Sequence, residues 1–445
     1  MGERTKEISR RNFLTASMGA ALGAAAMPLF GGPEKTGGVS KKRVALVGTG
    51  IRGSSTWGRN LVQNYGDILE FTGLCDTNPR RMEYARRYMG ADCPMFTDFD
   101  LMIAQTKPET VIVTTVDAFH AKYICRAMEL GCDVITEKPM ATDEKMAQEI
   151  LDAERRTGRK LIVTFNYRYS PDSVRIKEIL ESREIGEIIS VDFHWYLDTD
   201  HGASYFRRWH AFKQFSGSLL VHKATHHFDA MNWWLAAEPV EVNAGGGLRK
   251  YGHNGPFRSA RCMDCPRKGE CEFYWDITRD EHMMNLYVRA ESEDGYLRDA
   301  CVFRESINIW DTMSLQVQYH NGVTMNYSLN AFMPYEGYSV GFNGSKGRLD
   351  ARIYHAQPWP VDALAEFRLT RNFKDTKTFK IQSGGADHWG GDRKMQDQIF
   401  RSPGRDRLGQ KAGSRAGALS IMTGIAARRS IEQKRPFRIE ELIKI

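Results

Sequence analysis

The chain has 445 residues, of which 42% are hydrophobic, so it can bury a substantial core and should form two or three domains. Its formal net charge is +7, but the first 42 residues hold seven Lys or Arg against three Asp or Glu, so the remainder carries only +3. This small excess gives no indication of nucleic-acid binding, and without a strict repeat or a long low-complexity tract the sequence predicts neither a solenoid nor a mostly disordered chain.

Residues 1 to 38 have the pattern of an export signal and linker. The run SRRNFL at 9–14 opens an apolar stretch rich in Ala and Gly, which GGP at 31–33 ends. This pattern resembles a twin-arginine signal, which implies export of the folded protein to the periplasm by that machinery. The alternative is a chance Arg pair before an ordinary helix or a membrane anchor. No other segment offers about 18 uninterrupted apolar residues, so we expect no permanent membrane span.

A dinucleotide-binding motif follows directly. Residues 43–47 read as a short buried strand, and Gly48-Thr49-Gly50-Ile51-Arg52-Gly53 then opens a helical stretch at 55–63. In this setting Gly48 permits a tight turn, Gly50 lets the backbone approach a pyrophosphate, and Gly53 lets the helix pack closely on the strand. The helix N-terminus offers unpaired N–H groups to the phosphates, and we expect Ile51 and Arg52 to take part.

The next strand indicates which dinucleotide is bound. Residues 69–75 end in Asp76, which lies 23 residues beyond Gly53, close to the ~20 expected for the acid that binds the ribose. A carboxylate there favours NAD over NADP, whereas Arg80 and Arg81 follow closely and could reverse that preference. The alternative for Asp76 is a helix cap before Pro79.

Further elements alternate regularly up to residue 165. Helices or amphipathic segments are expected at 79–89, 99–105, 121–130 and 143–157, and strands at 110–115, 133–136 and 161–165. This order predicts a doubly wound parallel sheet, a Rossmann domain over residues 39–165, with ligands at the carboxyl ends of the strands. Four polar residues follow such ends and are candidates for cofactor binding: Thr115, His120, Glu137 and Lys138.

Five motifs in this order carry a resemblance: VALVGTGIRG, TTVDAFH, TEKP, NYRYSP and LLVHKATHHFDAMNWW. Together they resemble the glucose-fructose oxidoreductase and inositol dehydrogenase family, written Gfo/Idh/MocA, over residues 42 to 445. The resemblance implies a second α/β domain over residues 166–445, with an open, mostly antiparallel sheet that carries the substrate side and often the subunit contacts of a homo-oligomer. It also implies a sugar, inositol or related polyol as substrate. A C-terminal helix is expected to return to the core.

The resemblance assigns the proton-transfer residues. Lys138 matches the family's catalytic lysine, and His226 matches the histidine that helps move the hydroxyl proton, while the family's usual aspartate four residues earlier is His222 here. A Lys needs its pKa lowered from ~10.4 towards ~7 to act as a base. At i and i+4 on one helix the two imidazoles could share a proton or bind a metal, which the neighbouring Lys223 would oppose.

Two further groups are candidates for binding. Tyr167 and Arg168 follow a strand end and offer an aromatic face, a hydroxyl and a fork of donors to a sugar. Four cysteines fall within or near an insertion at about 245–305, namely Cys262, Cys265, Cys271 and Cys301. Their spacing is typical of a structural zinc site, with disulfides as the alternative in an oxidising compartment.

Three functions follow as alternatives. The first is an NAD(P)-dependent oxidoreductase that acts on a hydroxyl of a sugar, glycoside or polyol, with a tightly bound cofactor because a soluble nicotinamide pool is not expected outside the cytoplasm. The second is an NAD-dependent glycosidase that transiently oxidises its sugar, although EKP at 137–139 resembles the dehydrogenases more closely. The third is a non-catalytic sugar-binding protein with a vestigial Rossmann domain, which His222 in place of aspartate would suit.

Overall fold

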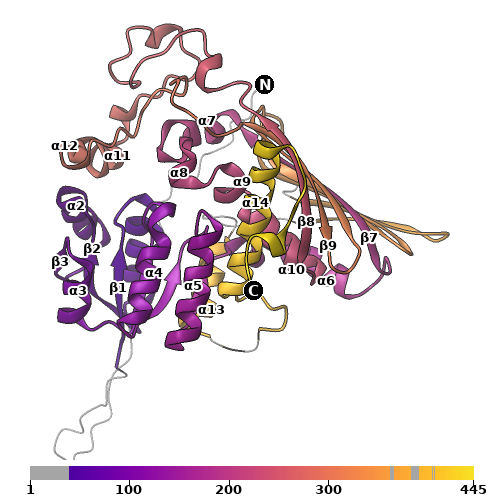
Figure 1. Ribbon diagram of the computed structural model, residues 1–445, viewed down its shortest axis with the longest axis horizontal. Helices are drawn as coiled ribbons and strands as arrows, with labels where there is room; N and C mark the ends of the chain where they lie inside the picture. Colours follow the sequence, from indigo (N-terminus) through magenta and orange to yellow (C-terminus); the bar gives the residue numbers. More distant parts are fainter. Residues whose placement is uncertain (1–39, 361–364, 382–389, 403, 405) are drawn as a thin grey trace, which may run out of the picture. The chain divides into compact units, whose positions relative to one another are not determined.

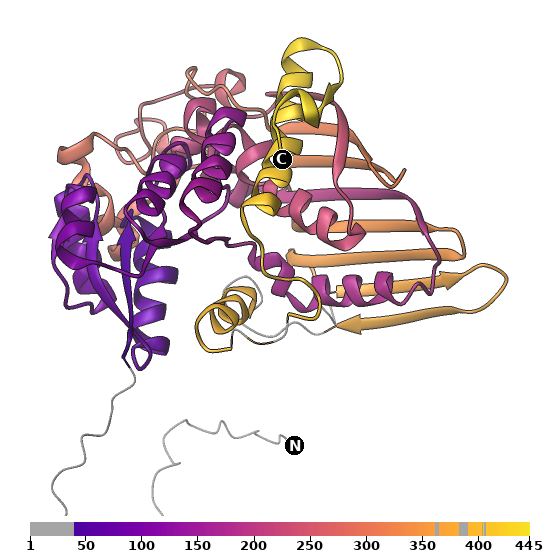
Figure 2. The same ribbon diagram turned by 60° about the horizontal axis from the view of Figure 1, so that its bottom comes forward.

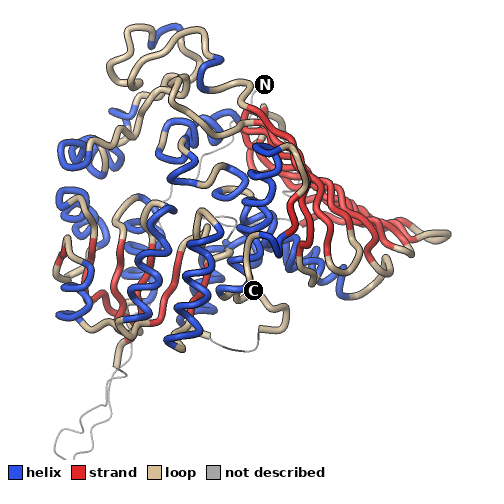
Figure 3. Tube along the Cα trace, viewed as in Figure 1, coloured by secondary structure: helices blue, strands red, loops and turns tan. Residues whose placement is uncertain are grey.

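The computed structural model describes residues 40–360, 365–381, 390–402, 404 and 406–445. The candidate signal at 1–38 lies outside these residues. Within residues 41–445 the chain builds two sheets (Figure 3). The first has six parallel strands in the order β3-β2-β1-β4-β5-β6. Its strands are β1 (Lys42–Val47), β2 (Leu69–Cys75), β3 (Met95–Phe96), β4 (Thr110–Val113), β5 (Asp133–Thr136) and β6 (Leu161–Val163).

Helices cover both faces of this sheet because its strands are apolar on both sides. Alternate strand residues enter two separate cores: Val47 and Val113 pack on the side of α4 and α5, whereas Leu46 and Ile112 pack with Trp57 on the other side. The helical segments are η1 (Arg52–Arg59), α1 (Asn60–Tyr65), α2 (Pro79–Met89), α3 (Phe99–Thr106), η2 (Asp117–Phe119), α4 (His120–Glu129) and α5 (Glu144–Thr157). The predicted doubly wound fold is therefore confirmed.

The second sheet has nine strands in the order β14-β13-β12-β11-β7-β10-β9-β8-β15. β7 and β10 pair in parallel, and the other neighbouring strands pair antiparallel. The strands are β7 (Ile188–Asp198), β8 (Pro239–Gly247), β9 (Thr312–Tyr319), β10 (Thr324–Met333), β11 (Glu336–Gly344), β12 (Gly347–Ala356), β13 (Ala365–Arg371), β14 (Thr376–Ile381) and β15 (Phe437–Arg438). This is the open, mostly antiparallel sheet that was expected.

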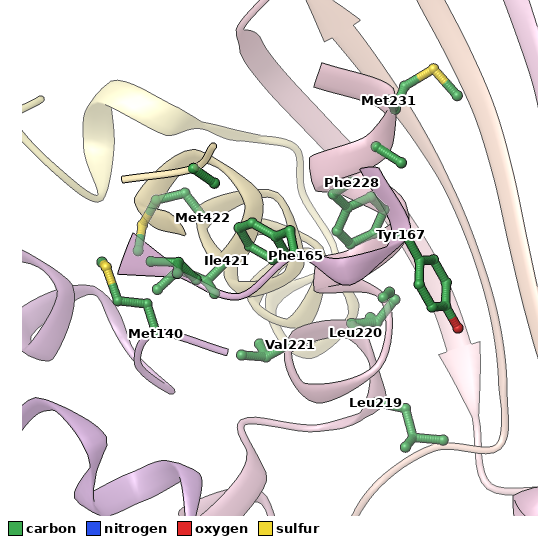
Figure 4. Close-up of a cluster of buried hydrophobic side chains, with 14 of the residues drawn as sticks. Met140, Phe165, Tyr167, Leu219, Leu220, Val221, Phe228, Met231, Ile421 and Met422 are labelled. Carbon is green, nitrogen blue, oxygen red and sulfur yellow. The ribbon is translucent and has the colours of Figure 1, made fainter. Parts of the chain in front are cut away.

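Helices α6 (Pro171–Glu181), α10 (Thr225–Leu235) and α14 (Ser414–Gln433) lie on one face of the second sheet (Figures 1 and 2). α14 also packs on α5 and β6, so it joins the two domains. Met140, Val221, Ile421 and Met422 belong to the apolar core at this junction (Figure 4). The backbones approach closely there, because a Cβ on Gly424 would lie 2.2 Å from the carbonyl oxygen of Leu220.

Short helices carry the chain between the two sheets. After β6, η3 (Asn166–Tyr169) leads into α6, whereas α7 (Thr199–Arg207), η4 (Trp209–Ala211), α8 (Lys213–Ser216) and α9 (Leu219–His222) lie between β7 and α10. α13 (Gly391–Phe400) follows β14, and η10 (Ile439–Glu441) follows β15. No helix in the described part of the chain is both long enough and apolar enough to cross a bilayer.

An insertion between β8 and β9 reaches back to the first domain. Its helical turns are η5 (Gly252–Asn254), η6 (Lys268–Glu270), η7 (Ile277–Arg279), α11 (Glu281–Leu286), η8 (Val288–Ala290) and α12 (Glu291–Asp294). Figure 1 shows α11 and α12 beside α2. The Asn78 side-chain amide donates to the carbonyl of Ala290 and to Asp294, both at 2.9 Å, and Arg80 pairs with Glu293 at 2.8 Å. The insertion therefore lies against the end of α2 that follows Asp76.

Candidate active site

A cavity of about 710 Å³ opens at the carboxyl ends of the first sheet's strands, a size suited to a small-molecule ligand. Its walls come from the glycine loop, the segments after β2, β4 and β5, the helices α7 to α10 and the insertion. Twelve of the residues predicted for the site line it: Gly48, Gly50, Ile51, Arg52, Asp76, Thr115, His120, Glu137, Lys138, Tyr167, His222 and His226. The structure thus brings residues that are far apart in sequence to one cavity.

The glycine loop has the shape that the motif predicts. Gly48 has a φ of +90°, and a Cβ there would lie 2.7 Å from the backbone of Thr114. A Cβ on Gly53 would lie 2.1 Å from the carbonyl oxygen of Gly48, so the helix that follows can pack this closely only on a glycine. The helix starts earlier than expected, with a π-helical segment from Arg52, and the Ile51 N–H donates to the Tyr287 hydroxyl at 2.9 Å.

Asp76 faces the same cavity from the end of β2. Its Oδ2 accepts from the Thr49 N–H at 2.7 Å and from the Thr49 hydroxyl at 2.8 Å, which fixes the carboxylate beside the glycine loop. The alternative of a helix cap is not what the structure shows, because Asn78 caps α2 by accepting from the Arg81 N–H at 2.9 Å. Arg81 itself pairs with Asp294 of the insertion at 2.7 Å and lies 3.8 Å from Asp76.

The loop after β5 is tied to the glycine loop by charged groups. Arg52 donates to Glu137 at 2.6 Å and forms two hydrogen bonds with Asp392 of α13, at 2.7 and 3.0 Å. The Trp57 indole also donates to Glu137, at 2.7 Å. The ring nitrogens of His120 lie 3.1 Å from the Thr115 carbonyl and 2.7 Å from that of Pro139. These contacts hold the loop on both sides of Lys138, at Glu137 and at Pro139.

Lys138 forms a connected group with His222 and Asp117. Its Nζ lies 3.5 Å from Nε2 of His222 and donates to the His222 carbonyl at 3.2 Å. Nδ1 of the same imidazole lies 2.5 Å from Oδ2 of Asp117. Burial lowers the pKa of Lys138 to about 8, although Asp117 and Glu137 oppose the shift. An amine with this pKa can release and take up a proton near neutral pH.

Burial also favours the uncharged forms of the two partners. It lowers the pKa of His222 well below 6.5, helped by the nearby Lys138 and Arg208. It raises the pKa of Asp117 well above 3.8, against the attraction of Lys138. The carboxyl group and the imidazole are joined through Nδ1, and Nε2 faces Lys138.

The expectation that His222 and His226 lie one turn apart on a single helix is wrong. α9 ends at His222, and α10 begins at Thr225. The His226 ring instead stacks on Tyr167, with ring centroids 4.3 Å apart and planes 12° apart. The Tyr167 hydroxyl accepts from Nζ of Lys223 at 3.1 Å. His226 and Tyr167 thus form one wall of the cavity, and no two-histidine metal site arises.

Arg168 does not reach the cavity, contrary to the sequence prediction. Its guanidinium forms a buried bidentate ion pair with Asp229 of α10, at 2.7 and 2.6 Å, and donates to the Gly409 carbonyl at 2.9 Å. The side chain is 7% exposed and each of its three nitrogens donates to Asp229 or Gly409, so it holds η3 against α10 rather than a substrate. Asp229 accordingly has Arg168 as its structural partner.

The predicted zinc site is not supported. Among the described residues, no three His, Cys, Asp or Glu side chains are grouped so that they could hold a metal ion. All eight cysteines are free thiols, so the disulfide alternative is not observed either. Cys262 accepts from a guanidinium nitrogen of Arg207 at 2.9 Å. Burial, helped by the nearby Cys262 and Cys301, raises the pKa of the Cys271 thiol, but these side chains do not form a group that could hold an ion.

Several residues of the site were missed by sequence reasoning. Asp117 lies within TTVDAFH, and a carboxylate near the end of β4 was the available signal. The insertion contributes four lining residues that no motif in the sequence indicates: Tyr287, Asp294, Tyr296 and Arg298. His201 lines the cavity as well and contacts both carboxylate oxygens of Glu336, at 2.9 and 2.8 Å.

A glycine loop, an acid after the second strand and a lysine in the same cavity define the class, an NAD(P)-dependent oxidoreductase. Comparison with known families agrees. The model described as "Oxidoreductase family, NAD-binding Rossmann fold" matches residues 42–165, and its partner, "Oxidoreductase family, C-terminal alpha/beta domain", matches residues 177–439. The chain belongs to the Gfo/Idh/MocA oxidoreductase family, whose dehydrogenases act on CH–OH groups with NAD(P).

Individual relatives extend this comparison. A Bacillus subtilis (strain 168) protein named as an oxidoreductase, YteT, is 36% identical over 430 residues, which are 91% of this chain and 99% of that one. The D-glucoside 3-dehydrogenase of Escherichia coli (strain K12) is 30% identical over 155 residues, 34% of this chain and 42% of its own. Levoglucosan dehydrogenase, solved with NADH and levoglucosan, shares the fold with a TM-score of 0.64 at 16% identity, over 90% of this chain and 100% of that one.

Proposed function

We propose that this protein oxidises a hydroxyl-bearing carbon of a sugar, glycoside or polyol with NAD held in the cavity between turnovers, and that the carbonyl group of a second sugar reoxidises the bound NADH. The observation that carries the proposal is the position of Lys138, whose buried amine has a pKa lowered to about 8 and shares one cavity with the glycine loop and Asp76. The relatives support the substrate class, since one is named for a glucoside and another was solved with levoglucosan.

The residues present fit a dinucleotide. The glycine loop leaves no room for side chains at Gly48 and Gly53, and Asp76 is placed to accept from a ribose hydroxyl. When bound, the nicotinamide accepts a hydride from the carbinol carbon. The carboxylate of Asp76 would repel a 2′-phosphate, and Arg80 and Arg81 are already paired with Glu293 and Asp294. These pairs support NAD over NADP.

The chain's own residues would move the proton that the carbinol loses. Neutral Lys138 takes the hydroxyl proton, and Nε2 of His222 faces the same amine from 3.5 Å. Asp117 positions His222 through Nδ1. His226, stacked on Tyr167, presents a second imidazole to the same cavity. In the direction of reduction, the protonated Lys138 returns the proton to the new alkoxide oxygen.

The insertion supports a retained cofactor. It pairs with α2 through Arg80 and Arg81, accepts from the Asn78 amide, and places the Tyr287 hydroxyl on the Ile51 N–H. These contacts join the insertion to the segment after Asp76 and to the glycine loop, so release of the cofactor would require several of them to open together. Retention suits a protein exported by the twin-arginine route, which we also propose for this chain from residues 9–14.

We further propose a homo-oligomer that uses the second sheet. Helices cover one face of this sheet, and no described helix covers the other (Figures 1 and 3). Light scattering of the purified protein measures the subunit number, and a monomer would contradict the proposal.

Export is tested by fusing residues 1–42 to a reporter. Replacing both Arg10 and Arg11 with Lys should keep the reporter in the cytoplasm.

The decisive experiment is to denature the purified protein and assay the supernatant for nicotinamide dinucleotide, then to follow its reduction on a panel of sugars and polyols. We expect about one NAD per chain and reduction by at least one substrate. A released keto product indicates a dehydrogenase, while a cleaved glycoside with no net NADH indicates the glycosidase alternative. If no dinucleotide is released and the apo protein binds none, the enzymatic proposals fail and a non-catalytic sugar-binding protein remains.

A further inference from the structure

Two arginines face the cavity without a carboxylate partner. Arg208 follows α7, Arg298 belongs to the insertion, and both line the cavity. Among the described residues neither guanidinium lies within ion-pairing distance of an acid, in contrast to Arg52 and Arg81 in the same cavity. Arg298 is 9% exposed, and its buried Nε has no hydrogen-bond partner.

Such a pair is costly without an anion. A buried guanidinium loses its hydration, and two like charges that approach each other in a poorly solvated site repel. Burial, and next the charge of Arg298, lower the pKa of Arg208 to about 10. The remaining contacts of the two groups do not neutralise them, since Arg208 donates to the Ser204 carbonyl at 2.9 Å and lies over the Tyr205 ring, while Arg298 lies over the Tyr287 ring.

The pair stands near the proton-transfer group. Arg208 immediately precedes Trp209 and His210, whose rings stack with centroids 3.5 Å apart, and the His210 ring lies 4.1 Å from that of His222. His210 is buried, and its Nδ1 has no hydrogen-bond partner. Aromatic rings of Tyr205, Trp209 and Tyr296 line the same region and offer faces on which a sugar ring can pack.

We propose that the substrate is an anionic sugar derivative, whose carboxylate binds between Arg208 and Arg298 while its hydroxyl-bearing carbon faces Lys138. The inference rests on the proposed function and names its substrate class. Two guanidiniums match the planar, two-oxygen shape of a carboxylate, and charge-assisted hydrogen bonds of this kind are the stronger ones in proteins. The carboxylate itself takes no part in the reaction: the C–H and O–H bonds of a neighbouring carbinol break, hydride goes to NAD, and the proton goes to Lys138.

The test uses the holoprotein and matched pairs of sugars. The probes are glucuronate, galacturonate and mannuronate with their methyl glycosides, each compared with the corresponding neutral hexose, and reduction of the bound dinucleotide gives kcat/KM. We expect at least one acid to exceed its neutral counterpart by roughly 100-fold, because the site's donors stay unpaired with the neutral sugar. Arg208→Met and Arg298→Met should each lower this acid-to-neutral ratio by roughly 100-fold. Arg289→Met, an exposed arginine of the same insertion that donates to Asn285, is the matched control and should keep the ratio.

Each outcome supports or overturns the proposed carboxylate site. Oxidation of neutral sugars with no preference for any acid would overturn the inference and leave the proposed function intact. If Arg298→Met and Arg298→Lys lose bound NAD in parallel with activity, the pair serves the cofactor pyrophosphate, and the inference fails. If no sugar is oxidised, tryptophan fluorescence titrated with the same acids separates the two proposals: binding that is lost in Arg208→Met supports the anion site without the enzyme, and no binding rejects both.

Discussion

Nδ1 of His222 lies 2.5 Å from Oδ2 of Asp117, although the two residues come from different domains and lie 105 positions apart. The family resemblance implies an aspartate at position 222, so the histidine there removes a carboxylate from the site. Asp117, the first residue of η2 after β4, places a carboxyl group beside that imidazole. Asp117 of the first domain therefore supplies the carboxyl group that the second domain lacks at position 222.

Replacing Asp117 with Asn tests this positioning role. The amide is a weaker partner for Nδ1 than the carboxyl group, so His222 loses the orientation that presents Nε2 to Lys138, and we expect kcat to fall about 100-fold with KM little changed. The pH profile of kcat should shift as well, because the Asp117 charge acts on Lys138. Bound NAD, measured after denaturation, should stay at the wild-type level.

A double-mutant cycle gives the control for this prediction. Asp117→Asn and His222→Gln act on the same hydrogen bond, so the double variant should lose little more activity than either single variant. Fully additive losses would show that the two residues act independently, and a kcat within twofold of wild type in Asp117→Asn would remove Asp117 from the mechanism.

The pH dependence of oxidation follows from the lowered pKa of Lys138. Only the neutral amine can take the hydroxyl proton, and it accumulates as the pH rises through about 8, so kcat should rise from pH 6 to a plateau above about 9. Lys138→Met and Lys138→Arg should both be inactive, since neither offers a base near neutral pH. Lys145→Met, an exposed lysine on α5, should retain the profile. Activity that is independent of pH over this range would assign the base elsewhere.

Much of the first domain could be predicted because its signals are local. Strands β1, β2, β5 and the helix α2 lie within a residue of their predicted bounds, since apolar runs end at Gly, Asp or Pro. The two-residue strand β3 was missed because it is too short to show a period. The strands of the second sheet were expected only as a class, since their pairing depends on contacts between segments far apart in sequence.

The site shows the same division between local and tertiary information. Gly48, Asp76 and Lys138 were found because each follows a strand end in a recognisable motif. The break between His222 and His226 was not, because the intervening Lys-Ala-Thr contains no Gly or Pro to mark it. The pairing of Arg168 with Asp229 and the reach of the insertion are tertiary, and no spacing in the sequence encodes them.

Cofactor choice should depend on the acids that face Arg81. In the double variant Asp76→Ser and Asp294→Asn, the carboxylate that would repel a 2′-phosphate is gone, and the Arg81 guanidinium loses its partner at 2.7 Å. We expect the NADP-to-NAD ratio of binding constants to rise by ~100-fold, measured by fluorescence titration of the apo protein. Asp264→Asn, an exposed acid of the insertion, is the control and should leave the ratio unchanged. A double variant that still rejects NADP would place the discrimination elsewhere.

Acid stability should depend on Glu336. Burial by itself would raise the pKa of this carboxyl group, but the hydrogen bond from His201, with the charge of Lys223, lowers it to about 2. A carboxylate whose pKa is lowered in the folded state stabilises the fold above its unfolded value near 4.5, and the contribution disappears as the pH falls from there towards 2. Glu336→Gln should therefore lower the free energy of unfolding by on the order of 2–3 kcal/mol at pH 7, with the difference from wild type shrinking below about pH 4.5. Urea unfolding followed by circular dichroism at each pH measures the difference.

Glu366→Gln on β13, half-exposed beside Lys380, is the control and should show no such trend. A wild-type advantage that persists unchanged at pH 3 would mean that Glu336 stabilises the fold through packing rather than through its charge.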